Sequence, residues 1–211
     1  QRQEQEFPKA ADSPEGLLRA GELQASTDDF RAAVLTFDRV GASYPNSVFA
    51  TRAELATGHL YLKQNRYLQA EKAFSQALRS AVDKSNKAAA ELGLGRVAQA
   101  GGDLLTAQKH YLNAIDLAGD EIAAEAQFRI AQTFEAEQQY KKAAVEFLKV
   151  KYLYGSYLTW VVPAVYQAAL ANEKMQLWGE ARKLYQSILD NYKDEQHKRR
   201  AQERLQAIAG Q

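Results

Sequence analysis

The stretch that decides the fold of this chain is YLQAEKAFSQA, at residues 67–77. In it Tyr67 is followed after three residues by Ala70, after seven by Phe74 and after ten by Ala77. The spacings i, i+3, i+7 and i+10 fall on one face of an α-helix, whereas a strand would divide them between its two faces. The stretch therefore predicts an amphipathic helix with small and aromatic residues on its buried face.

The same pattern occurs five times along the chain. Its copies, each an aromatic residue or leucine, then an alanine, then an aromatic residue, are Phe30, Ala33, Phe37; Tyr67, Ala70, Phe74; Leu104, Ala107, Tyr111; Tyr140, Ala143, Phe147; and Trp178, Ala181, Tyr185. The five alanines lie 37, 37, 36 and 38 residues apart. Twelve residues before each alanine stands a small residue, at Gly21, Gly58, Gly95, Ala131 and Ala169. A register kept over five copies predicts a repeat protein.

Each copy is predicted to be a hairpin of two helices. The half before each pattern is rich in good helix formers, and turn-forming residues separate the halves at 27–29, 64–66 and 101–103. The corresponding turns at 137–139 and 176–177 are weaker in sequence. We expect the two helices to cross where small residues let their backbones approach, and neighbouring hairpins to stack because one alone cannot bury its apolar face.

This pattern, a small residue, an alanine twelve residues on and an aromatic four further, resembles the tetratricopeptide repeat (TPR). The resemblance implies an all-α fold, a right-handed TPR superhelix (an α-α solenoid) of five helical hairpins plus a C-terminal capping helix. The units, at 36 to 38 residues, exceed the standard length. In the first helices, Tyr61 and Phe134 match the usual aromatic position, whereas Gln24, Ala98 and Asn172 do not.

The domain organisation follows from the repeat register. We expect a flexible leader at 1–13, a capping helix and tail at 193–211, and between them TPR units at about 14–46, 47–83, 84–119, 120–156 and 157–192. The run at 198–200, Lys-Arg-Arg, is interpreted as part of the polar cap, and a basic surface for phosphate or acidic protein is the alternative.

Composition excludes several functions. The 27 Lys and Arg residues balance 26 Asp and Glu, so no excess of positive charge is available for nucleic acid. Cysteine is absent, which excludes disulfides and thiolate chemistry. His59, His110 and His197 fall in different repeats without a metal-binding spacing, and Gly93 and Gly95 form a lone GxG inside a helical pattern. We therefore predict no enzyme, no metal and no cofactor, with no transmembrane span in this chain.

The concave surface of such a solenoid is lined by the first helices, and there we expect a partner protein to bind through a peptide or helix. The residues predicted to line this groove, taken from an apolar row and two mixed rows beside it, are Leu55, His59, Leu62, Leu92, Arg96, Gln99, Phe128, Gln132, Glu135, Tyr166, Leu170 and Glu173. The alternative is that the apolar row belongs partly to the core. The carboxylate clamp of chaperone-binding TPR proteins is not matched, since its positions hold Leu18, Glu22, Ala56, Ala89 and Gly93.

The densest aromatic cluster of the chain is the second candidate contact site. It consists of Tyr152, Tyr154, Tyr157 and Trp160, around a Gly-Ser pair at 155–156. Large rigid aromatic residues at a loop are typical of interface hot spots, and packing between the last two repeats is the alternative.

The junction Tyr44-Pro45-Asn46-Ser47 between long repeats is similar to that of TPR proteins of the bacterial cell envelope, such as the coordinator of the Tol-Pal system and the lipoprotein of outer-membrane protein assembly. This resemblance implies a scaffold in the periplasm or at the outer membrane. A cytoplasmic or organelle TPR adaptor is the alternative, and the oligomeric state stays open.

Overall fold

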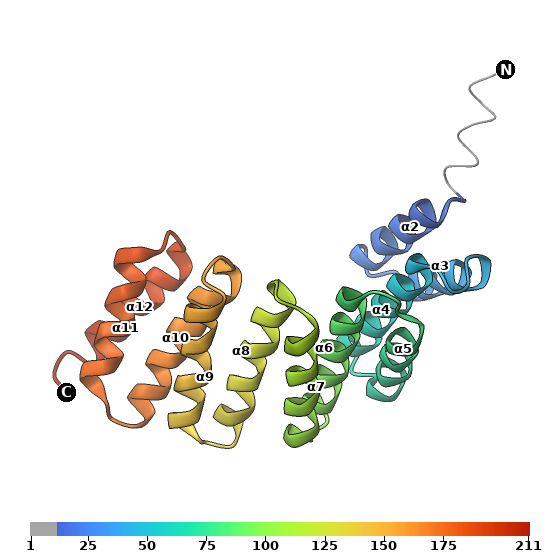
Figure 1. The fold of residues 1–211 in the computed structure, drawn as a ribbon. Helices are drawn as coiled ribbons and strands as arrows, with labels where there is room; N and C mark the ends of the chain where they lie inside the picture. Colours follow the sequence, from blue (N-terminus) through green and yellow to red (C-terminus); the bar gives the residue numbers. More distant parts are fainter. Residues whose placement is uncertain (1–11) are drawn as a thin grey trace. The chain divides into compact units, whose positions relative to one another are not determined.

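The computed structural model describes residues 12–211, and over these residues the chain is all-helical, with eleven α-helices and no strand (Figure 1). The helices are α2 (Pro14–Ser26), α3 (Phe30–Ser43), α4 (Val48–Lys63), α5 (Tyr67–Ser80), α6 (Lys84–Ala100), α7 (Leu104–Leu117), α8 (Glu121–Ala136), α9 (Tyr140–Leu153), α10 (Leu158–Lys174), α11 (Trp178–Asn191) and α12 (Glu195–Ala207). The all-α fold class is confirmed. The predicted leader at 1–13 lies outside the described residues as far as residue 11, and Ser13 caps α2 by accepting a hydrogen bond from the Gly16 N–H at 3.0 Å.

The chain divides into two compact units, residues up to 106 and residues 107–211. In the first unit α2, α3, α4 and α5 each pack against the next helix, and α4 also packs against α2 and α6. In the second unit α8 to α12 pack in the same way, with α10 between α8 and α12. Within each unit, the first helices α2, α4, α8 and α10 therefore contact both the second helix of their own hairpin and the first helix that follows, or α12 in the case of α10, as stacked hairpins require.

The repeated stripe forms the core of both units. The five alanines of the pattern are completely buried, and the aromatic residue four positions on is at most 2% exposed in every copy. The residues seven positions after the alanines are completely buried too, at Val40, Ala77, Ala114, Val150 and Ile188. The helical spacing predicted for residues 67–77 is confirmed in all five copies.

The small residues of the first helices make room for these aromatic rings. A Cβ atom on Gly58 would lie 2.7 Å from the Phe74 ring, and one on Gly21 would lie 2.5 Å from the Phe37 ring. Phe74 also fills the space at Gly93 of the following hairpin, where a Cβ would lie 2.4 Å from the ring. The Phe74 ring thus fills the space that two glycines leave free in two successive first helices.

The turns inside the five hairpins share one geometry. Five residues before each pattern alanine the backbone has positive φ, at Asp28, Asn65, Gly102, Gln138 and Gln176. The following N–H donates back to a carbonyl in the last turn of the first helix, for example Gln139 N to Phe134 O at 2.8 Å and Leu177 N to Asn172 O at 2.9 Å. This Schellman-type ending fixes where each second helix begins. The two turns that look weakest in sequence adopt the same geometry as the others.

Candidate protein-binding surfaces

The apolar row predicted for the groove is buried. Leu55, Leu92, Phe128 and Tyr166 are each at most 8% exposed. The Phe128 ring centre lies 5.2 Å from that of Phe147 in its own hairpin and 5.6 Å from that of Trp160. A partner would reach these four residues only at their edges.

The two rows of mixed polar and apolar residues beside the apolar row are more accessible to solvent. In the first unit α4 presents an exposed His59 and a half-buried Leu62, while Arg96 and Gln99 on α6 are half-buried. The His59 ring lies edge-on to the Phe74 ring at 5.0 Å. His59 keeps part of its surface open to solvent, but its ring packs against Phe74, and this desolvation together with the positive charge of Arg96 lowers the pKa of His59 to about 4. This imidazole is therefore neutral at physiological pH and offers one donor and one acceptor.

The second unit carries the corresponding residues on α8 and α10. Gln132, Glu135 and Leu170 are half-buried. Burial raises the pKa of Glu135, and the nearby charge of Lys174 opposes that shift. The surface here is amphipathic and holds a carboxylate beside an ammonium group.

Glu173, the last residue predicted for the groove, is buried in a polar network that joins three helices. Its carboxylate accepts hydrogen bonds from the Tyr185 hydroxyl of α11 at 2.5 Å and from the Arg204 guanidinium of α12. Burial acts to raise the pKa of Glu173, but the hydrogen bonds from Arg204 and Tyr185 outweigh it, so this pKa lies below its ordinary value. Glu173 thereby links α10 to α11 and α12.

The aromatic cluster does not act as one surface. Trp160 packs inward against Phe128, whereas Tyr152 is 73% exposed at the end of α9. Tyr154 and Tyr157 are half-buried, and burial raises the pKa of Tyr154. Only Tyr152 stands open to a partner over most of its surface.

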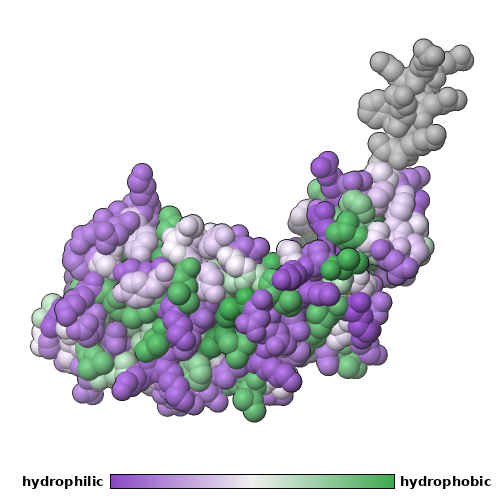
Figure 2. Space-filling view, viewed as in Figure 1, coloured by the Kyte–Doolittle hydropathy of each residue, from purple (hydrophilic) through white to green (hydrophobic). Residues whose placement is uncertain are grey.

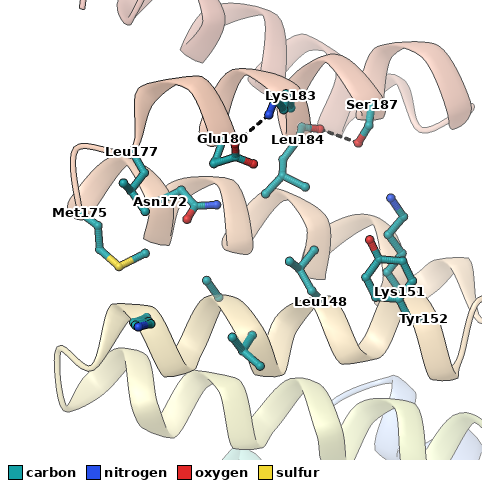
Figure 3. A pocket seen from close by; sticks show the side chains of 13 residues that line it. Leu148, Lys151, Tyr152, Asn172, Met175, Leu177, Glu180, Lys183, Leu184 and Ser187 are labelled. Carbon is teal, nitrogen blue, oxygen red and sulfur yellow. Dashed lines mark hydrogen bonds and ion pairs between the residues drawn. The ribbon is translucent and has the colours of Figure 1, made fainter.

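A groove that the sequence did not predict opens between α9 and α11 (Figure 3). This α9–α11 groove has a volume of about 480 Å³ and is lined by Lys141, Ala144, Val145, Leu148, Lys151, Tyr152, Asn172, Met175, Leu177, Glu180, Lys183, Leu184 and Ser187. Met175 and Leu177 lie at one end and Lys151 and Tyr152 at the other, with Leu148 between them (Figure 3). The groove therefore lies on the second helices, away from the rows predicted on the first helices.

The sequence did hold a signal for this groove. Val145 and Leu148 are apolar yet lie outside the buried stripe of their helix, and Val145 is 52% exposed. Leu177 is 47% exposed in a turn, where polar residues are usual. Exposed apolar residues recur elsewhere on the surface, and Figure 2 shows hydrophobic and hydrophilic side chains interleaved over the face in view. Single exposed leucines are common on protein surfaces, and only their gathering around one hollow makes a site.

No chemistry-bearing cluster stands out in the part of the chain that the structure describes. Residues 12–211 contain no group of three His, Cys, Asp or Glu side chains placed to hold a metal ion. Among the described helices, none combines the length and the apolar character that a membrane-spanning segment needs. His197 lies beside Asp194, where its ring nitrogen is 2.9 Å from the carboxylate that caps α12.

Comparison with solved structures identifies the fold. YrrB, described as a TPR protein with an unusual peptide-binding site, aligns over 94% of this chain and 98% of its own, with a TM-score of 0.59 and 18% identity. A tetratricopeptide repeat protein from Parabacteroides merdae aligns over 93% and 73%, with a TM-score of 0.67 and 13% identity. MamA from Desulfovibrio magneticus aligns over 69% and 78%, with a TM-score of 0.55 and 26% identity. A search of curated protein sequences found no match.

The family model described as Tetratricopeptide repeat matches two segments, residues 15–47 and 164–195. The first segment covers α2 and α3, and the second covers most of α10 and all of α11. Between them the same alanine register and turn geometry recur in every hairpin. The two matched segments and the hairpins repeated between them show that this chain has the fold of tetratricopeptide repeat proteins, a fold typical of protein–protein interaction scaffolds.

Proposed function

We propose that the chain is a non-enzymatic scaffold that binds a peptide or helix of a partner protein on the face formed by its first helices. The observation that carries this proposal is the accessible mixed row beside the buried apolar row, with His59 and Leu62 in the first unit and Gln132 and Leu170 in the second. Side chains of this mixed character suit an amphipathic segment. The peptide-binding site of YrrB, a protein of the same fold, supports the proposal.

Site-specific crosslinking in cells tests the binding face. A photoreactive phenylalanine analogue placed at His59 or Gln132 is expected to capture a partner protein. The matched control is the same analogue at Leu68, which is 63% exposed on the second helix α5. Capture from Leu68 with none from His59 and Gln132 would contradict the proposal.

We also propose that the scaffold works in a bacterial envelope assembly, in the periplasm or at the outer membrane. The resemblance of the junction at residues 44–47 to envelope TPR proteins supports this location. In the structure this junction is a tight connection, with positive φ at Asn46 and Ser47 capping α4 through the Ala50 N–H at 3.1 Å. Fractionation of the source cells with detection of the protein by antibody tests the location, and recovery in the cytoplasm would contradict it.

A further inference from the structure

The α9–α11 groove has an apolar floor and a positive rim. Its floor is made by Ala144, Val145, Leu148, Met175, Leu177 and Leu184. Three lysines, Lys141, Lys151 and Lys183, stand around this floor with a single carboxylate, Glu180. Glu180 accepts a hydrogen bond from Lys183 at 2.7 Å, and the Lys151 ammonium lies 5.5 Å from the Tyr152 ring centre. The rim therefore keeps a net positive charge.

The dimensions of the groove suit a helix. Its lining residues extend over 141–152 on α9 and 180–187 on α11, so the groove runs for about two to three helical turns. On α9 the lining residues follow the spacing 141, 144, 145, 148, 151 and 152, which is one continuous stripe along that helix. A third helix can lay an apolar stripe between two such walls.

Leu177 is an apolar groove residue at a position where a polar side chain could cap a helix. It is the N-cap residue of α11 and makes no capping hydrogen bond. At the same register Asp29 and Asp103 do cap, accepting from Ala32 N at 3.1 Å and Thr106 N at 3.0 Å, whereas Arg66 and Gln139 make no capping hydrogen bond. Leu177 is the one apolar side chain among these five. A leucine at an N-cap lacks the side-chain hydrogen bond that an aspartate would give to the first turn, which lowers helix stability. Such departures from local preference are expected at functional positions.

We infer that the α9–α11 groove binds an acidic amphipathic helix of a partner protein. The apolar stripe of that helix packs on Leu148, Leu177 and Leu184, and Glu or Asp residues on its flanks meet Lys141, Lys151 and Lys183. This surface is separate from the first-helix face of the proposed function. A scaffold with both surfaces can hold two partners at once.

Met175 offers a direct measurement because it is the only methionine of the chain and lies on the groove floor. Labelling the full chain with ¹³C-methyl methionine gives a single methyl resonance. The probe is a helical peptide with leucines at i, i+4, i+7 and i+11 and glutamates on the flanking positions. We expect saturable movement of the resonance, and at least tenfold weaker binding of the same peptide with lysine in place of every glutamate.

Two variants separate binding from folding. Leu177→Asp introduces the aspartate cap found in two other hairpins, so the melting temperature of the protein is expected to stay the same or rise. Binding of the acidic peptide is expected to become at least tenfold weaker. The matched control, Leu35→Asp, replaces another exposed leucine, on second helix α3, and is expected to leave binding unchanged. In the Leu177→Asp protein the Met175 resonance still reports whether the groove is folded.

Three results would overturn the inference. Equal affinity for the glutamate and lysine peptides would show that the lysines of the groove do not recognise acidic residues. Unchanged binding by the Leu177→Asp variant would show that the peptide binds outside the α9–α11 groove. Movement of the Met175 resonance on simple dilution of the protein would show that a second copy of the chain occupies the groove. None of these results bears on the crosslinking at His59 and Gln132, so the two surfaces are tested separately.

Discussion

The ring of Phe74 occupies the space left by two missing side chains, those of Gly58 and Gly93. Packed interiors tolerate added volume poorly, because neighbouring side chains already sit in allowed rotamers. A glycine in a helix interior normally gives up about 1 kcal/mol relative to alanine. At these two positions close packing with one aromatic ring accounts for the glycine.

The first prediction concerns Gly93. Gly93→Ala is expected to lower the free energy of unfolding by about 1–3 kcal/mol, since the new Cβ would overpack against Phe74. Gly41→Ala is the control, because Gly41 is in helix α3 with nothing within 4 Å of an added Cβ. It is expected to raise stability by about 0.5–1 kcal/mol. Urea denaturation measures the free energy of unfolding of both variants. Equal changes in the two would contradict the close packing of Phe74 against Gly93.

The second prediction concerns the protonation of His59. Its pKa of about 4 lies below the unfolded value of 6.5, so the unfolded chain takes up the proton first as pH falls. The resulting stability is present above pH 6.5 and is lost as pH falls toward 4. The imidazole resonances of His59 are expected to titrate well below pH 6, and Arg96→Gln should raise the midpoint. A midpoint near 6.5 in the parent protein would contradict the prediction.

At the scale of the element, the turn between paired helices controls the start of each second helix. Its positive-φ residue is Asn65 in the second hairpin but Gln138 in the fourth. Asparagine tolerates this conformation better than glutamine does. Gln138→Asn is therefore expected to stabilise the protein by up to about 1 kcal/mol, and Asn65→Gln to destabilise it similarly. Thermal melts measure both, and shifts of the same sign would contradict the prediction.

The attachment of α12 depends on Glu173, Tyr185 and Arg204. Since the pKa of Glu173 is lowered in the folded state, its stabilising contribution is present above the unfolded value of about 4.5 and is lost as pH falls through the folded value. Glu173→Gln is expected to reduce stability at pH 7 by about 2–3 kcal/mol, in the range of hydrogen bonds to charged groups.

Stability measured against pH checks this role of Glu173. The variant is expected to lose less stability than the parent between pH 5 and the acid limit, because it lacks the carboxylate that titrates. A control, Glu180→Gln, removes a surface ion pair with Lys183 and should change stability by less than about 1 kcal/mol. Parallel pH profiles for the parent and Glu173→Gln would contradict the assignment.

The sequence predicted the elements well and the surfaces less well, for a physical reason. The stripe at 67–77 predicts a helix because its period reports the buried face directly. Burial of Phe128 and Tyr166 could not be predicted in the same way, because it depends on how closely the next first helix packs. Glu173 has the register of a surface residue, and only the approach of Arg204 from α12 makes it internal. The α9–α11 groove is formed by residues of three helices, so the exposed apolar residues of each segment indicate a site only once the helices are packed together.

At the scale of the whole molecule, stability is a sum of contributions from neighbouring hairpins. Ala143→Phe, at a completely buried position of the second unit, is expected to destabilise that unit by several kcal/mol through overpacking. Hydrogen exchange measured by mass spectrometry should show faster exchange in α8 to α11 while α3 to α5 stay protected. Uniform loss of protection over all described helices would show that the chain unfolds as one cooperative body.

The outer face of α12 has a consequence for self-association. This helix buries Ala201 against the last hairpin, while Arg199, Glu203 and Gln206 remain exposed. Stacked hairpins are a head-to-tail interface, and a head-to-tail interface that does not close on itself propagates into a filament. The charged side chains on this face of α12 oppose the stacking of a further hairpin, which would need an apolar stripe there.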